Sequence, residues 1–481
     1  MPHDPLTRTL YDELCRIPLL DPHSHIDPLA PTARSLDDLL GYHYYTELAH
    51  SAGMGQELLG PDADPRERCR AILAHMDRFD NTAQYAWFVA IVNSFLGLSL
   101  ERVTAADCDR LFDTAAQVFA RPGWEEQVFH RSNLEKVFLT NNFDDPLDGF
   151  DTSRYVPCLR TDDLVFHLDK PEVRQRLAKA TGVEVGDTAS LRKAVGSLFE
   201  RFTRRGAKAC AISLPPRFEP FPAENSQGLE MVVRTINSDR YVDQQMRHAG
   251  IFWMLAEFCR EYRLPFDLMV GVNRRVYRGG VFQGQDLFDQ RTSLIQYQEL
   301  FNAFPEVTFC VSVLSSGQNQ ELVAYSWIFP NVVTSGHWWY SNIPAYIEPD
   351  LRARLQAVPK TKQLGYYSDA YKLEFILPKY NMYRRLLARV LADDFVRPGV
   401  YSESQAVDLA RLQAVPKTKQ IGYYSDAYKL EFILPKYNMY RRILAQLLAD
   451  DFVRPGVYSE TQAVEFARLL LRDNSRRIFG V

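Results

Sequence analysis

The chain has 481 residues, of which 46% are hydrophobic and 12% aromatic, and its formal net charge is −4. This composition supplies enough apolar side chains for a large core and excludes a generally disordered protein. No run of Lys and Arg accompanies the small net charge, so we expect neither a nucleic acid nor a membrane surface as a partner. The length fits two or three average domains, or one large barrel.

Seven scattered cysteines without a Cys-x-x-Cys pair indicate reduced thiols. No apolar segment of the secretory type follows the N-terminus, so we expect no signal peptide. The longest apolar stretch, 85–100, is shorter than the roughly twenty residues of a bilayer span, and it contains Asn93 and Ser94. We therefore expect 85–100 to form a buried helix and the protein to be cytoplasmic.

The first predicted strand, 17–23, ends beside His23 and His25, which are one residue apart. Alternate side chains of a strand share a face, so both histidines can bind one cation from the same side. Imidazole suits divalent metals, zinc above all, and a metal in an open site activates water or polarises a substrate oxygen. The alternative is a pair of hydrogen-bonded histidines at a strand end. We expect a divalent metal, with zinc as the first candidate.

Short apolar segments then alternate with helical stretches along the chain. This alternation indicates an α/β fold with a parallel sheet, and eight strands suggest a closed (β/α)8 TIM barrel. The active site of such a barrel lies at the strand C-terminal ends, where His23, His337 and Asp369 fall. The predicted strands are 17–23, 135–140, 155–160, 208–214, 266–272, 307–313, 331–335 and 362–369, and helices include 171–204, 239–262 and 317–328.

The interval between the first two strands is too long for one barrel helix. Its helical pattern begins with Ser35, a helix N-cap candidate, followed by an acidic first turn. We expect an α-helical insertion beside the barrel mouth. The predicted organisation is 1–25 for the first strand, 26–134 for the insertion and 135–412 for the rest of the barrel.

Residues 356–412 are repeated as 413–469. The two 57-residue copies align without a gap and differ at seven positions. Each copy contains a predicted strand and a predicted helix, which spans 381–392 in the first copy. The second copy runs into a C-terminal tail, 470–481.

A closed barrel has no place for a ninth strand, so only one of Asp369 and Asp426 can join His23 and His25. The first copy follows the seventh strand directly, whereas seating the second would require looping out one whole copy. We therefore predict that the first copy supplies strand eight and Asp369, and that 413–469 is displaced. If the second copy is seated instead, Asp426 becomes the ligand.

Short motifs follow the predicted strand ends in a definite order. They are His23-Ser24-His25, Gly41-Tyr42-His43-Tyr44, Asp144-Asp145-Pro146, Arg160-Thr161-Asp162, Gly271 to Arg274 with Gly284 to Asp286, Trp338-Trp339-Tyr340 and Ser368-Asp369. In this order, over nearly the whole chain, the sequence resembles the uronate (glucuronate) isomerase family of the amidohydrolase superfamily. The resemblance implies a TIM barrel of the metal-dependent hydrolase type. It also implies a metal-dependent aldose–ketose isomerase of carbohydrate metabolism that acts on a hexuronate.

Moving a proton from carbon 2 to carbon 1 of a uronate requires a base. Asp369 is the candidate for this role as well as for metal ligation, and a hydroxide activated by the metal is the alternative base. Tyr44 is a candidate for positioning a hydroxyl or relaying a proton, with simple packing as the alternative. His337 is the third catalytic candidate, and its alternative is a structural hydrogen bond.

The distant carboxylate of a uronate requires a cationic partner. Arg160 and Arg274 can each hold it through paired N–H donors, although salt bridges to Asp162 and Asp286 explain them equally well. The remaining substrate-binding candidates are Trp338 and Tyr371.

Three positions depart from the family pattern. Met269 stands where the family carries a strand-five histidine, Cys210 lies where it carries Ser-Asp-His, and Tyr371 replaces an arginine. These departures keep two alternatives open: another metal-dependent hydrolase or decarboxylase acting on a small carboxylate, and a non-catalytic sugar-acid-binding protein. A sugar acid is the expected partner in the main hypothesis, and a homo-oligomer is compatible with it.

Overall fold

The computed structural model describes residues 4–60, 62–222 and 240–413, together with isolated positions between 441 and 464. The chain divides into two compact units, Met1–Pro416 and Lys417–Val481. The predicted displacement of the second repeat copy, its Asp426 and the tail therefore lie outside the described residues.

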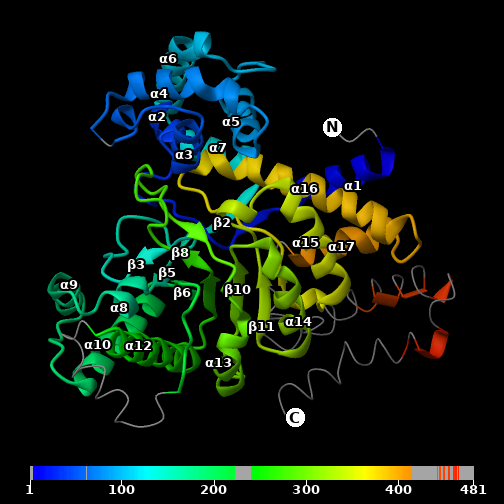
Figure 1. Ribbon diagram of the computed structural model, residues 1–481. Helices are drawn as coiled ribbons and strands as arrows, with labels where there is room; N and C mark the ends of the chain where they lie inside the picture. Colours follow the sequence, from blue (N-terminus) through cyan, green and yellow to red (C-terminus); the bar gives the residue numbers. More distant parts are fainter. Residues whose placement is uncertain are drawn as a thin grey trace. The chain divides into compact units, whose positions relative to one another are not determined.

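Parallel strands form the centre of the first unit (Figure 1). One ladder has the order β1-β2-β4 and the other the order β12-β11-β10-β7-β6-β5-β3, and every pairing within them is parallel. The strands are β1 (Leu19–Asp21), β2 (Leu134–Phe138), β3 (Asn141–Asn142), β4 (Tyr155–Val156), β5 (Cys158–Arg160), β6 (Ala209–Leu214), β7 (Phe266–Val270), β10 (Phe309–Val313), β11 (Val332–Ser335) and β12 (Gln363–Leu364). A short antiparallel pair, β8 (Val272–Asn273) with β9 (Leu287–Phe288), follows β7.

The two ladders are joined along the chain, because only two residues separate β2 from β3 and one separates β4 from β5. At the outer edges, the N–H of Asp369 donates to the carbonyl oxygen of His23 at 3.2 Å. The N–H of His25 donates to the carbonyl oxygen of Ala370 at 2.8 Å. The segment after β12 therefore lies directly beside the segment after β1.

The predicted α/β fold with a parallel sheet is confirmed, and each predicted strand overlaps an observed one. The eighth is much shorter than expected. Its ladder to β11 ends at Leu364, and the chain then turns to hydrogen-bond with the segment after β1. Asp369 itself is not extended but left-handed, with φ of 52°.

Helices alternate with these strands. They are α8 (Asp162–Phe166), α9 (Pro171–Thr181), α10 (Thr188–Arg204), α12 (Tyr241–Tyr262), α13 (Gln298–Ala303), α14 (Asn319–Ile328), α15 (Pro344–Ala357), α16 (Ile376–Leu391) and α17 (Glu403–Gln413). The single helix predicted over 171–204 is wrong, because Gly182 ends α9 at φ of 71° and Asp187 caps α10 by accepting from the N–H of Ser190. The helix predicted over 381–392 begins five residues early, at Ile376.

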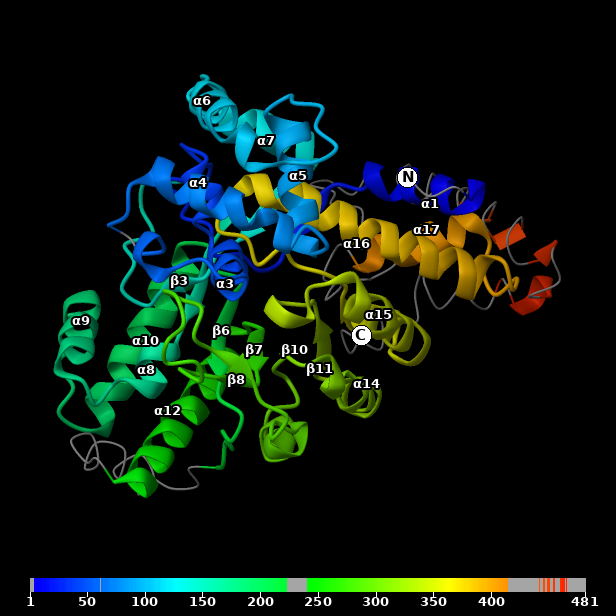
Figure 2. The ribbon, with the colours of Figure 1, turned by 45° about the horizontal axis from the view of Figure 1, so that its top comes forward.

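The segment between β1 and β2 is helical. It contains α2 (Asp37–Leu40), α3 (His43–Ser51), α4 (Pro65–His75), α5 (Ala83–Phe95), α6 (Cys108–Phe119) and α7 (Trp124–Ser132). Its apolar side chains share one core with α16 and with the N-terminal helix α1 (Pro5–Arg16). In Figure 2, α5 and α7 lie against α16, so the segment is anchored to the helix that follows Asp369. None of the helices in the described part of the chain combines the length and apolar character of a membrane span.

Candidate functional site

Two histidines and a carboxylate converge where β1 and the segment after β12 meet. His23 and His25 follow β1, and their ring centroids are 5.2 Å apart. Asp369 Oδ1 lies 3.7 Å from His23 Nε2 and 3.4 Å from His25 Nε2. One ligand atom from each of the three residues lies within 4.8 Å of the others. The spacing suits one cation between them.

The polar atoms of this cluster fit a metal. His23 Nε2 and Asp369 Oδ1 are buried and have no hydrogen-bond partner among the described residues. Thr140 Oγ1 donates to the carbonyl oxygen of Ser24 at 2.9 Å, so it can only accept from His25 Nδ1, also at 2.9 Å. His25 then presents the lone pair of Nε2 to Asp369. Two imidazole nitrogens and a carboxylate oxygen are the donor set of a divalent metal such as zinc.

Burial and charge set the protonation of the cluster. Burial, with a smaller contribution from His25, lowers the pKa of His23 to about 3. Burial alone would raise the pKa of Asp369, but the nearby His25, with His23 and Lys379, holds it below its ordinary value. At neutral pH the cluster therefore holds a neutral His23 and an ionised Asp369, which are the metal-binding forms.

Two tyrosines from the first helical segment hold Asp369. Tyr44 Oη donates to Oδ2 at 2.8 Å, and Tyr42 Oη donates to the backbone carbonyl at 3.0 Å. Tyr44 Oη also accepts from the N–H of Trp339 at 3.1 Å. A non-glycine residue at positive φ is strained, and such strain persists where the surroundings fix it. Here the tyrosines direct Oδ1 of Asp369 at the histidines.

Tyr371 connects the two arginine candidates to the cluster, because it contacts His25 and feels the charges of both arginines. The Tyr371 ring stacks on the His25 ring at 4.9 Å, and burial raises the Tyr371 pKa against the opposing charges of Arg160 and Arg274. Both predicted salt bridges are present. Arg160 Nε is 3.1 Å from Asp162 Oδ2, and Arg274 Nη1 is 2.6 Å from Asp286 Oδ2.

His337 and Trp338 have other partners. His337 Nε2 lies 3.2 Å from Asp350 Oδ2, and burial, then the charge of Arg354, lower its pKa to about 4. Trp338 packs in a small apolar cluster with Met269 and Tyr367. No described contact joins either residue to His23, His25 or Asp369, so the structure does not bring them into the cluster.

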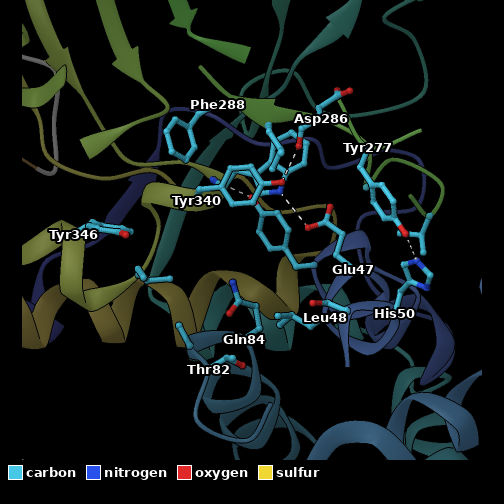
Figure 3. Close-up of a pocket in the computed structure, with 18 of the residues that line it drawn as sticks. Glu47, Leu48, His50, Thr82, Gln84, Tyr277, Asp286, Phe288, Tyr340 and Tyr346 are labelled. Atoms are coloured by element: carbon cyan, nitrogen blue, oxygen red, sulfur yellow. Dashed lines mark hydrogen bonds between the residues drawn. The ribbon is translucent and has the colours of Figure 1, made fainter. Parts of the chain in front are cut away.

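A cavity of about 1320 Å³ lies beside α3 (Figure 3), and Tyr44 is one of its lining residues. Figure 3 shows Glu47, Tyr340 and Asp286 around it, and Tyr340 Oη donates to the carbonyl oxygen of Asp286 at 2.8 Å. Its described lining contains no lysine or arginine. Two of its lining residues bond to site candidates: Tyr44 donates to Asp369, and Asp286 pairs with Arg274. His23, His25 and Asp369 are not among the described lining residues.

Sequence reasoning missed several buried polar residues. His43 Nδ1 lies 2.7 Å from Glu47 Oε1, and the Trp339 indole donates to Glu47 Oε2 at 3.2 Å. The i, i+4 spacing of His43 and Glu47 on a predicted helix was the available signal. No local pattern marked Asp21 or Lys379, which hold the backbone before Asp369.

The family model for glucuronate isomerase matches residues 3–413. The chain belongs to the glucuronate isomerase family. The matched region includes the first repeat copy, with Asp369, and ends where the second copy begins.

Similar proteins agree with this membership. A uronate isomerase of Rhizorhabdus wittichii is 24% identical over 446 residues, which cover 85% of this chain and 94% of that protein. One from Nostoc punctiforme is 22% identical over 89% of this chain and 95% of its own length. Among solved structures, a glucuronate isomerase from Caulobacter crescentus has a TM-score of 0.79 at 20% identity and covers 88% of this chain and 96% of its own. The uronate isomerase of Thermotoga maritima has a TM-score of 0.78 at 17% identity, and the match covers 86% of this chain and 96% of that one. These structures share the fold.

Proposed function

We propose that the protein is a metal-dependent uronate isomerase that interconverts a hexuronate, such as glucuronate or galacturonate, and its ketose form. The observation that carries the proposal is the convergence of His23, His25 and Asp369 in a chain of this family. A sugar acid is the required partner. The cytoplasmic location and a homo-oligomeric state stay predictions.

We further infer that the strands close into a (β/α)8 barrel, with 26–134 inserted after strand one and the first repeat copy as strand eight. The hydrogen bonds from Asp369 to His23 and from His25 to Ala370 support this closure, because they join the two outer edges of the ladders. Closure places the metal cluster at the C-terminal ends of strands one and eight, where barrel enzymes carry their sites.

His23, His25 and Asp369 would hold the divalent metal, for which zinc is the first candidate. When bound, it would supply Lewis-acid stabilisation of charge on the substrate oxygens. The chain's own residues account for the proton movements.

Isomerisation moves the C2 proton of the aldose to C1, while a hydroxyl proton passes from O2 to O1. Ionised Asp369 is the proposed base for the carbon-bound proton, held in place at Oδ2 by Tyr44. Burial, followed by the charge of Asp369, raises the Tyr44 pKa well above its ordinary value, so Tyr44 stays protonated. We assign Tyr44 the role of relaying the hydroxyl proton from O2 to O1.

Arg160 and Arg274 are the proposed partners of the substrate carboxylate. Arg274 is about half exposed, with 51% of its side chain accessible, and pairs with Asp286 at the cavity edge. Tyr371, stacked on His25, would contact the sugar. His337 and Trp338 are assigned structural roles beside the site. Asp350 contacts the histidine, and apolar side chains surround the indole.

The test is incubation of the metal-loaded protein with glucuronate and with galacturonate, followed by detection of ketose. We expect turnover of at least one. Absence of turnover of both, with one metal bound per chain, would contradict the proposal. In that case Met269 and Tyr371 favour the second candidate, a metal-dependent hydrolase or decarboxylase, and a library of esters, amides and carboxylates tests it.

A further inference from the structure

Lys379 is a fully buried cation beside the proposed metal site. It extends from the first turn of α16, and its exposed fraction is 0%. Its Nζ donates to the carbonyl oxygen of Ser368 at 2.8 Å and lies 3.5 Å from Tyr42 Oη. Tyr42 in turn donates to the carbonyl oxygen of Asp369. Lys379 therefore hydrogen-bonds the carbonyl group of Ser368 directly and is linked to that of Asp369 through Tyr42.

Asp21 holds the same peptide from the opposite side. Its Oδ1 accepts from the N–H of Ser368 at 2.8 Å and from Tyr380 Oη at 3.1 Å, and its Oδ2 accepts from the Ser368 hydroxyl. Ser368 is therefore fixed at its N–H by a buried anion and at its carbonyl by a buried cation. The next residue is Asp369, in its left-handed conformation.

An aromatic cage surrounds the Lys379 ammonium. Its Nζ lies 4.7 Å from the Trp87 ring centroid, 5.1 Å from that of Tyr44 and 5.4 Å from that of Tyr42. Cation–π attraction compensates part of the cost of burying a charge. Burial lowers the Lys379 pKa to about 8, while Asp369 and Asp21 oppose the shift. Tyr42, Tyr44 and Trp87 all come from the helical segment between β1 and β2.

We infer that Lys379 is a positioning residue that fixes the Ser368–Asp369 peptide so that Asp369 Oδ1 meets the two histidines. The inference rests on the metal centre of the proposed function. Without the ammonium, the Ser368 carbonyl loses its charged donor and Asp21 loses its compensating charge. The strained backbone at Asp369 can then relax, and the third ligand moves away from His23 and His25.

The experiment compares Co²⁺ binding and the visible Co²⁺ spectrum in the full chain, wild type against Lys379→Met. The matched control is Lys362→Met, because Lys362 is also partly buried and donates to two backbone carbonyls, those of Ser326 and Phe329. Burial lowers its pKa to about 8 as well. We expect Lys379→Met to weaken Co²⁺ binding by about 10- to 100-fold and to change the spectrum. Lys362→Met should change neither.

Wild-type binding of one Co²⁺ per chain, abolished in His23→Ala, is measured first and tests the metal centre itself. If that holds and Lys379→Met binds Co²⁺ with wild-type affinity and spectrum, the inference is overturned while the proposed function stands. If Lys379→Met does not fold, Tyr42→Phe removes one of the two links with a smaller change. A shifted spectrum in Tyr42→Phe supports the inference, and an unaltered one overturns it.

Discussion

Two buried histidine–carboxylate groups lie near strand ends in the described part of the first unit, and they differ in how their carboxylate oxygens are bonded. Asp350 is saturated: Oδ1 accepts from Ser316 at 2.7 Å, and Oδ2 lies 3.2 Å from His337 Nε2. Asp369 Oδ1 has only the two imidazole nitrogens, at 3.4 and 3.7 Å. The two carboxylates are equally buried, each with 4% of its surface exposed. Among the described contacts, only His337 Nδ1 lacks a partner in the Asp350 group, whereas in the Asp369 group His23 Nε2 and Asp369 Oδ1 both lack one and lie 3.7 Å apart. A carboxylate oxygen facing an imidazole nitrogen, both without a hydrogen bond, distinguishes the group that can accept a cation.

The largest effect should come from removing a ligand. His25→Ala deletes one of three donors, and we expect isomerase activity and metal affinity to fall by more than about 100-fold, beyond the usual cost of losing an outer partner. The measurements are ketose formation and metal titration. His75→Ala is the control, because His75 lies on α4 with its ring bonded to the Ala71 carbonyl. Equal losses in both variants would contradict the comparison.

Removing the hydroxyl that holds Asp369 should have the next largest effect. Tyr44→Phe leaves Oδ2 without its donor, and we expect kcat to fall by about 10- to 100-fold. Tyr45→Phe is the matched control on the same helix, since its hydroxyl donates to the Gln84 carbonyl. Unchanged kcat in Tyr44→Phe would mean that the hydrogen bond from Tyr44 is not needed to position Asp369.

A smaller effect is expected at the carboxylate-binding arginines. Arg274→Met should raise KM for a uronate by roughly tenfold, the size of one charge-assisted hydrogen bond, with little change in kcat. Arg291→Met is the control, because Arg291 forms a similar half-exposed pair with Asp289. A fall in kcat at constant KM would assign Arg274 to another role.

A substitution in the His337–Asp350 group should reduce stability and leave metal binding unchanged. His337→Gln should reduce the free energy of unfolding by about 1–3 kcal/mol through the broken Asp350 contact. The pKa of His337 is about 4 when folded and 6.5 by its ordinary value, so between them the unfolded chain binds more protons. The stability due to neutral His337 is therefore complete above pH 6.5 and is lost as pH falls toward 4.

Urea unfolding of wild type and His337→Gln between pH 4 and 7 tests this sign. The stability difference should shrink as the pH falls. A loss of metal affinity in His337→Gln would show that the two histidine–carboxylate groups are coupled.

Sequence patterns identified the parts of this molecule that depend on local spacing. Apolar segments between helices predicted the parallel sheet, and the motif order predicted the family. The spacing of His23 and His25, with one residue between them, predicted that their side chains converge. The structure brings both beside Asp369, although they follow β1 and do not lie in it.

Contacts between distant segments could not be read in the same way. His337 was predicted as a catalytic candidate with a structural hydrogen bond as the alternative, and the sequence did not show that Asp350, thirteen residues later on α15, is its partner. Lys379 was missed because its partners come from α3, α5 and the segment before α16, and only the folded chain brings them together.

The most direct test of the metal centre is the metal content of purified wild type, Asp369→Asn and Asp426→Asn, which alter equivalent positions of the two repeat copies. We predict about one divalent metal per chain in wild type and Asp426→Asn, and a strong loss in Asp369→Asn. Retention of metal in Asp369→Asn together with its loss in Asp426→Asn would contradict the account.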